Sequence, residues 1–212
     1  MQNQKPVVFV IGDSISIQYG PFLQELIKDD FCYDRKQGED EALIDLDVPN
    51  GANGGDSGMV LRYIKHRLCD PAWRPALALV NCGLHDIKSP QPDVLQVPVN
   101  DYKNNLAEIV RLFDQHDIRL AWVCSTPVVD QIHNSRSKSF KRFSRDLIAY
   151  NAVADKIMTD SKVPLADLYT MTATLGNDAF RDHVHFIESV QRKQAQFLAN
   201  FIRDLHTKGY FG

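Results

Sequence analysis

The chain lacks the long hydrophobic segments that cross membranes. Among its 212 residues, no apolar run approaches the roughly 20 residues needed to span a bilayer. Residues 1–6 also lack the order of charged, apolar and small residues that marks a secretory signal. We therefore predict a protein with no membrane span. We expect a cytoplasmic protein, or an exported one if a signal peptide has been removed from it.

Cysteine is scarce, and the basic residues are dispersed. The four cysteines, Cys32, Cys69, Cys82 and Cys124, form no Cys-x-x-Cys pair, so zinc and thioredoxin-like chemistry are poorly supported. We expect no disulfide and interpret Cys82 and Cys124 as buried thiols. The net charge is −3, and no dense Lys/Arg patch is interleaved with aromatics, so nucleic acid is not an expected partner. The most basic stretch, residues 136–145, is interpreted as a solvated loop and helix start.

The composition is that of an ordinary globular protein, and strand and helix patterns alternate along it. Apolar residues make up 44% of the chain and charged residues 24%, which fits a single domain over residues 1–212. The strand-like runs cover residues 7–11, 42–48, 76–81, 119–124 and 163–168. The helical patterns cover residues 19–28, 59–69, 102–115, 141–160 and 189–206. This alternation predicts an α/β fold with a parallel sheet between helices.

Several polar segments follow the predicted strands. Ser14 comes directly after the first strand, Gly55 lies in the loop after the second, and residues 83–86 and 125–127 follow the third and fourth. Ligands of open α/β sheets bind beyond the carboxyl ends of the strands. We therefore expect these segments to converge on one rim of the molecule.

Ser14 ends an apolar run in Gly12-Asp13-Ser14, an arrangement that presents a hydroxyl at the carboxyl end of a strand. Serine is a weak nucleophile until a neighbouring base takes its proton. His185 is the candidate base, and Asp182, three residues before it, would orient its ring. The alternative interpretations are that Ser14 is a turn or N-cap residue and that Asp182 caps the last helix.

Two neighbouring patterns compete with this interpretation. His183 is a second candidate for the base, and His183-Val-His185 also resembles a metal-binding pair, although no partner ligands are evident and we predict no metal. Ser57 in Gly-Asp-Ser-Gly resembles the nucleophile motif of trypsin-like proteases. Those proteases are disulfide-rich double β-barrels, so Ser57 is instead interpreted as the cap of a helix that starts near Met59.

Acyl transfer also needs donors aimed at the developing oxyanion. The backbone N–H of Ser14 is one candidate. Gly55 is another, because glycine permits close backbone approach and unusual dihedral angles. A third donor would come from a side chain in the Gly-Leu-His-Asp segment, residues 83–86.

Together these motifs resemble the SGNH (GDSL-type) hydrolase family. The family places its nucleophile in Gly-Asp-Ser, an oxyanion glycine after the second strand, Gly-x-Asn-Asp after the third, and Asp-x-x-His near the C-terminus. Ser14, Gly55, Asp182 and His185 match these positions. The resemblance implies a flavodoxin-like three-layer α/β/α sandwich with five parallel strands. It also implies a serine esterase that needs no cofactor.

One position departs from the family pattern. His85 stands where the family has the asparagine that donates to the oxyanion. A neutral imidazole donates one hydrogen bond and an imidazolium two, so His85 can replace the amide. We expect this role to depend on protonation, since histidine titrates near neutral pH. The alternative is a structural histidine that bonds a loop carbonyl.

The expected activity is hydrolysis of short-chain esters through an acyl-enzyme. The polar segments 30–40 and 125–138 suit a hydrophilic alcohol, so the favoured substrate is an acetyl ester, with an acetylated sugar as one candidate. An acyltransferase, lipase or thioesterase of the same fold is an alternative. A carbohydrate-binding protein with a spoiled oxyanion hole is another.

Overall fold

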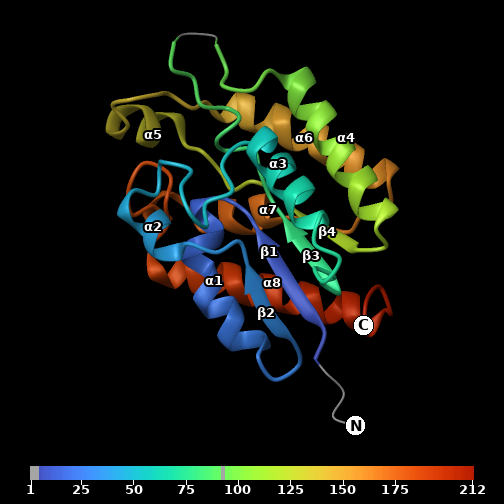
Figure 1. Ribbon diagram of the computed structural model, residues 1–212. Coiled ribbons are helices and arrows are strands. Elements are labelled where there is room, and N and C mark those ends of the chain that lie inside the picture. The colour runs from blue at the N-terminus through green and yellow to red at the C-terminus, as the bar shows by residue number, and fades with distance from the viewer. Residues whose placement is uncertain (1–4, 92–93) are drawn as a thin grey trace.

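The fold is built on one five-stranded parallel sheet, whose strands run through the middle of the molecule in Figure 1. The computed structural model describes residues 5–91 and 94–212. The strands follow the spatial order β2-β1-β3-β4-β5. Their bounds are β1 (Val7–Ile11), β2 (Cys32–Arg35), β3 (Leu77–Val80), β4 (Arg119–Val123) and β5 (Leu165–Ala166).

Two groups of helices cover the two faces of the sheet. On one face α1 (Ser14–Ile27) packs against α8 (Glu188–Thr207), which also contacts α7 (Leu168–Ala173). On the other face α4 (Val99–Gln115) lies between α3 (Ser57–Leu68) and α6 (Ser144–Asp160). The shorter elements are α2 (Glu39–Ile44), α5 (Asp130–Arg136) and the 3₁₀ turn η1 (Asn177–Ala179). This is the predicted three-layer sandwich. No helix in the described residues is both long and apolar enough to traverse a bilayer.

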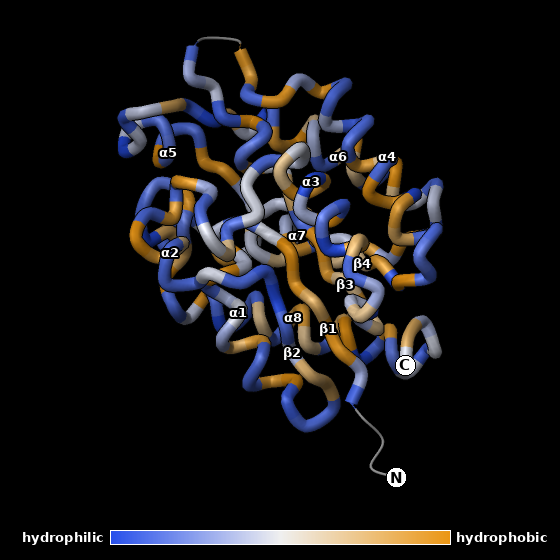
Figure 2. The backbone as a smooth tube through the Cα atoms, in the orientation of Figure 1, coloured by the Kyte–Doolittle hydropathy of each residue, from blue (hydrophilic) through white to orange (hydrophobic). Residues whose placement is uncertain are grey.

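The central strands are buried on both faces. All four residues of β3 and the last four of β1 are buried, and these two strands form a continuous hydrophobic stretch in Figure 2. Parallel strands covered by helices on both sides need apolar residues at every position. This is why the sequence marks them as unbroken apolar runs.

The strand order places the functional loops together. From β1 the chain runs to its neighbour β2 on one side, and it then crosses to β3 on the other side. A crevice opens at such a switch point, beyond the carboxyl ends of the strands. The segments that follow β1 and β3 meet there, which confirms the predicted convergence of the loops at Ser14 and His85.

The predicted second strand is wrong. Residues 42–48 contain the second half of α2 and the turn after it, and the strand that pairs with β1 is Cys32–Arg35. The apolar alternation at 42–48 does not reflect burial, because Leu43 and Ile44 are exposed. Three acidic residues in the first turn of α2 favour a helix there, since negative charge stabilises a helix N-terminus. The segment 30–40 is therefore not a loop but contains the edge strand β2 and the start of α2.

The helix α1 begins five residues earlier than predicted, at Ser14. The Asp13 side chain caps it by accepting the N–H of Ile15 at 3.0 Å. Pro21 inside the helix and the β-branched residues of its first turns disguise the helical pattern. The short helices α5 and α7 were also not predicted, and the segment 125–138 contains α5 rather than being only loop.

Three helices end in the same hydrogen-bonded turn. At the end of α4 the N–H of Ile118 donates to Phe113 O (3.1 Å), and Asp117 is left-handed with φ = 54°. At the end of α6 the N–H of Val163 donates to Met158 O (2.8 Å), and Lys162 has φ = 57°. This is the Schellman motif, whose left-handed residue is usually glycine. The end of α8 follows that rule with Gly209.

We expect Lys162→Gly to raise the free energy of unfolding by about 0.5–1 kcal/mol. The left-handed conformation costs a residue with a Cβ about 1–2 kcal/mol, and the greater freedom of glycine in the unfolded chain offsets part of this gain. Asp117→Gly should stabilise less, because aspartate tolerates this conformation better. The measurement is urea denaturation, with Gly209→Ala as the reverse control. That methyl group meets no atom within 4 Å, so its destabilisation reports the backbone cost alone.

Candidate active site

Ser14 lies at the junction of β1 and α1. It is the first residue of the helix and is almost fully buried. The N–H of such a residue has no acceptor within its own helix and is available to a ligand. Gly12 is required before it, because a Cβ there would lie 2.9 Å from Ser16 Cβ. The turn thus presents both a hydroxyl and a free backbone donor.

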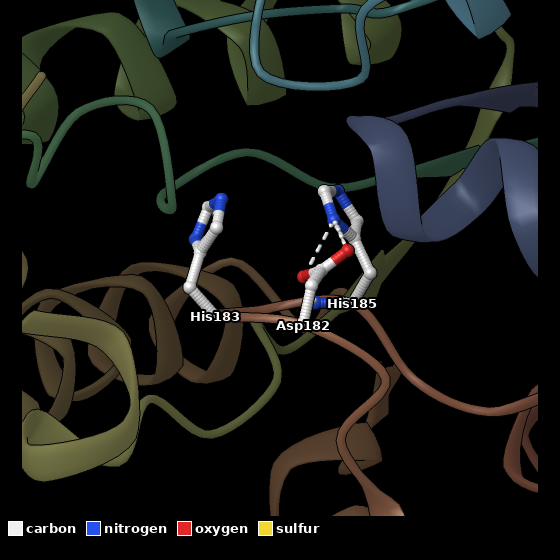
Figure 3. Close-up of side chains that lie close together, drawn as sticks. All are labelled: Asp182, His183 and His185. Carbon is white, nitrogen blue, oxygen red and sulfur yellow. Dashed lines mark hydrogen bonds and ion pairs between the residues drawn. The ribbon is translucent and has the colours of Figure 1, made fainter. Parts of the chain in front are cut away.

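His185 reaches Ser14 from the other end of the chain. Its Nε2 lies 2.8 Å from Ser14 Oγ, and its Nδ1 lies 2.9 Å from Asp182 Oδ2. Figure 3 shows the Asp182 carboxylate facing the His185 ring, with the start of α1 beside the ring. The predicted trio is therefore assembled in hydrogen-bonding order, carboxylate to imidazole to hydroxyl.

The loop that carries Asp182 and His185 fixes its own geometry. Asp182 Oδ1 accepts the backbone N–H groups of Val184 (3.0 Å) and His185 (2.8 Å). Partial burial raises the pKa of Asp182. The hydrogen bonds from the His185 ring and from these N–H groups outweigh that effect and hold the pKa well below its usual range. Asp182 is therefore a fixed carboxylate at neutral pH, able to orient His185. It does not cap the last helix, which begins at Glu188.

Gly55 lies in a loop attached to the nucleophile turn. The N–H of Gly54 donates to Gly12 O at 2.8 Å, which brings residues 53–56 against the turn before Ser14. Gly55 has φ = +72°, and a Cβ there would lie 2.6 Å from Met59 Sδ, so only glycine fits. Its N–H donates to Asn53 Oδ1 at 3.0 Å. Gly55 must release this acceptor to serve an oxyanion, and its role as a donor stays a prediction.

His85 is buried beside the same crevice with hydrogen-bonding capacity to spare. Its Nδ1 is enclosed, and the ring makes no hydrogen bond to a loop carbonyl in residues 5–91 and 94–212. This argues against the structural alternative. Burial, and then the charges of Lys88 and Arg142, lower the pKa of His85 well below its ordinary value. This direction of shift runs against the expectation that its role changes with protonation near neutral pH, because a lowered pKa favours the neutral ring there.

The sequence as a whole matches a known family. The family model described as GDSL-like lipase/acylhydrolase matches residues 8–198. The chain belongs to this GDSL family. It is therefore a hydrolase of carboxylic esters. None of the curated proteins compared with it is significantly similar in sequence.

Solved structures of similar fold include several esterases and lipases. An acetyl xylan esterase, AlAXEase, superposes on the GDSL chain with a TM-score of 0.69 at 15% identity, covering 92% of this chain and 99% of that one. A GDSL-like lipase from Bacteroides thetaiotaomicron gives a TM-score of 0.68 at 16% identity, covering 99% and 91%. The psychrotrophic esterase EstA from a Pseudoalteromonas species gives 0.67 at 15%, covering 96% and 100%. At these identities the likeness shows the fold.

The structure of the GDSL hydrolase separates the two candidate bases. His183 stands beside the bonded pair of Asp182 and His185 without joining it (Figure 3), and its Nε2 bonds Asp47 Oδ2 at 2.8 Å. Its Nδ1 lies 3.1 Å from Nδ1 of His133. Asp182, His183 and His185 could each offer a metal-ligand atom, and these atoms lie within 4.8 Å of one another. Both ring nitrogens of His185 are already used by Asp182 and Ser14, so an ion bound there would dismantle the trio.

The contacts of Ser57 in the GDSL hydrolase are those of a structural residue rather than of a nucleophile. It is the first residue of α3 rather than its cap, because Asp56 caps the helix by accepting the N–H of Met59 at 2.9 Å. Ser57 Oγ accepts from Asn105 Nδ2 (2.9 Å), and the Ser57 N–H donates to the buried Asp86 carboxylate (3.0 Å). Asp86 thereby ties the loop after β3 to the start of α3.

The sequence did not reveal the buried cations of the GDSL site. Within the stretch interpreted as solvated, Arg142 is only 2% exposed, and its Nε donates to Leu84 O at 2.7 Å. Lys88 Nζ donates to Asp47 O at 2.6 Å, and burial lowers the pKa of Lys88 to about 8. Both cations lie over the ring of Phe140. They fix the loop that carries His85 and add positive potential beside it.

Proposed function

We propose that this GDSL hydrolase is a serine esterase that forms an acyl-enzyme on Ser14. The observation that carries the proposal is the continuous chain from Asp182 through His185 to Ser14 Oγ, with contacts of 2.9 and 2.8 Å. A base within hydrogen-bond reach of the hydroxyl, itself oriented by a carboxylate, is the arrangement that activates serine.

Each group has a distinct part in the proposed reaction. Ser14 Oγ attacks the ester carbonyl while His185 Nε2 takes its proton, and Asp182 stabilises the resulting imidazolium. The N–H of Ser14 and the ring of His85 donate to the oxyanion, joined by Gly55 once its N–H leaves Asn53. His185 then gives its proton to the leaving alkoxide, and water attacks the acyl-enzyme by the same route in reverse.

The proposed substrate is a short-chain ester, with acetyl favoured. One structural neighbour is named as an acetyl xylan esterase, which supports an acetylated carbohydrate as a candidate. Polar groups near the trio also support a polar alcohol, because Asp45, Asp47 and Arg181 line the hollow next to His185.

We expect the protein to hydrolyse p-nitrophenyl acetate with a higher kcat/KM than p-nitrophenyl octanoate. A fluorophosphonate should inactivate it and add its mass to one peptide, the one that contains Ser14. The measurements are initial rates across a series of acyl lengths and mass spectrometry of the labelled protein. Labelling at Ser57, or a preference for octanoate, would contradict the proposal. Product that passes to an added alcohol at the expense of hydrolysis would indicate an acyltransferase.

A further inference from the structure

A hollow opens beside His185, and none of the proposed oxyanion donors lines it. Its volume is about 300 Å³, at the small end of the range for ligand pockets. One wall comes from α2 and the turn that follows it, and the other from the loop that carries Asp182 and His185. Its lining includes Leu43, Ile44 and Asp47 on the first wall and His183 and His185 on the second.

The chemistry of acyl transfer decides which part of an ester lies in this hollow. His185 Nε2 must deliver its proton to the oxygen of the departing alcohol, so that oxygen lies against His185 when the C–O bond breaks. The carbonyl oxygen points to the oxyanion donors instead. Ser14, Gly55 and His85 do not line the hollow, whereas His185 does. The hollow is thus on the alcohol side of the reacting carbon.

The α2 wall presents apolar side chains to solvent. Leu43 is 57% exposed and Ile44 is 86% exposed, and they are consecutive in the chain. The helix is anchored by Ala42, which is buried against Ile17 and Ala52, so these two side chains are held outward. An exposed apolar pair at the mouth of a catalytic pocket is suited to bind an apolar ligand surface.

The polar part of the hollow is held in place by two contacts of Asp47. Its carboxylate bonds His183 Nε2 at 2.8 Å, and its carbonyl accepts from Lys88 Nζ. These contacts join the turn after α2 to the loops that carry His185 and His85. The apolar wall is therefore fixed relative to the catalytic groups, and a bound alcohol would be positioned rather than loosely held.

We propose that this hollow is the subsite for the leaving alcohol, and that Leu43 and Ile44 select esters of alcohols with an apolar ring face over esters of small alcohols. The inference rests on the proposed esterase function and names the alcohol class that it acts on. Leu43, Leu46 and Arg181 also line a second hollow of about 320 Å³, lined as well by residues of α1, which leaves room for a larger alcohol to extend.

The test compares cyclohexyl acetate with ethyl acetate, two alkyl esters that form the same acetyl-enzyme. In the double variant Leu43→Ala, Ile44→Ala, kcat/KM for cyclohexyl acetate should fall about tenfold or more, because even one methylene in an apolar pocket is worth that much. For ethyl acetate it should stay within about twofold, as for ordinary surface substitutions. Ethyl butyrate reports the acyl side and should behave like ethyl acetate.

The matched control is Ile148→Ala on α6, since Ile148 is 54% exposed and does not line this hollow. It should change none of the three rates. Equal losses with ethyl and cyclohexyl acetate in the double variant would overturn the subsite, as would a loss confined to ethyl butyrate. A wild-type protein that hydrolyses none of these esters and takes up no fluorophosphonate would instead overturn the esterase function and the subsite with it.

Discussion

Replacing Ser14 with alanine should lower kcat for p-nitrophenyl acetate by on the order of 10⁴-fold to 10⁶-fold, the loss seen when a serine nucleophile is removed. The reason is structural. The Ser14 hydroxyl is the only hydrogen-bond partner of His185 Nε2 within the described residues, and it donates to that nitrogen at 2.8 Å. Without it, His185 has no oxygen to activate except water. The measurement is the steady-state rate of both proteins at one pH, with thermal unfolding to check that each is folded.

The matched control is Ser57→Ala, because both serines follow a Gly-Asp pair and begin a helix. Ser57 Oγ accepts from Asn105 and forms no hydrogen bond with a histidine in the described part of the chain, so activity should stay within about threefold of wild type. A Ser57→Ala protein as inactive as Ser14→Ala would mean that the hydroxyl at the start of α3 is also needed for the reaction, and Ser14 would no longer stand out as the nucleophile. An active Ser14→Ala protein would remove the proposed nucleophile.

The hydrogen-bonded trio of Asp182, His185 and Ser14 could be predicted because its signals are local. Ser14 needs only a buried strand, a tight turn and a helix start, and Asp182 and His185 lie within one short loop. The turn chemistry is visible in the sequence as Gly-Asp-Ser and Asp-x-x-His. The prediction that Ser14 meets Asp182 and His185, far along the chain, rested on the β-α alternation, because it places the carboxyl ends of the strands on one rim.

The second strand could not be predicted because its residues carry no apolar pattern. The strand β2 reads Cys-Tyr-Asp-Arg, and as an edge strand it pairs only with β1. The more hydrophobic run at residues 42–48 was chosen instead. In that run, Leu43 and Ile44 are large apolar residues that are nevertheless exposed to solvent. Exposed apolar residues of this kind are expected where function, rather than stability, selects a side chain.

The buried polar groups were invisible for a different reason. Arg142 and His133 have ordinary polar neighbours in the sequence, and only tertiary packing encloses them. His133 meets His183, which lies 50 residues further along the chain, and Arg142 reaches back 58 residues to Leu84. A single sequence predicts elements and local turns. It does not indicate which charged side chains the loops will cover.

The second large effect is expected at His85. If its ring donates to the oxyanion, His85→Ala should lower kcat by on the order of 100-fold, the usual loss for one such donor. Its KM should change little, because the oxyanion develops only in the transition state. If His85 has only a structural role, His85→Ala should lower the stability of the fold without lowering kcat selectively over KM. Thermal unfolding and the separate values of kcat and KM therefore decide between the two roles.

His85→Asn supplies the control, because the resemblance to the family implies an asparagine amide as the donor at this position. It should retain most of the activity and leave the shape of the pH–rate profile unchanged. Burial and the nearby cations lower the pKa of His85 well below its usual value, so the ring is already neutral and donates one hydrogen bond near neutral pH. Exchanging it for asparagine removes no ionisation from that range. A profile that flattens in His85→Asn would show that His85 titrates during catalysis. Its burial and the charges of Lys88 and Arg142 would then lower its pKa less than the structure indicates.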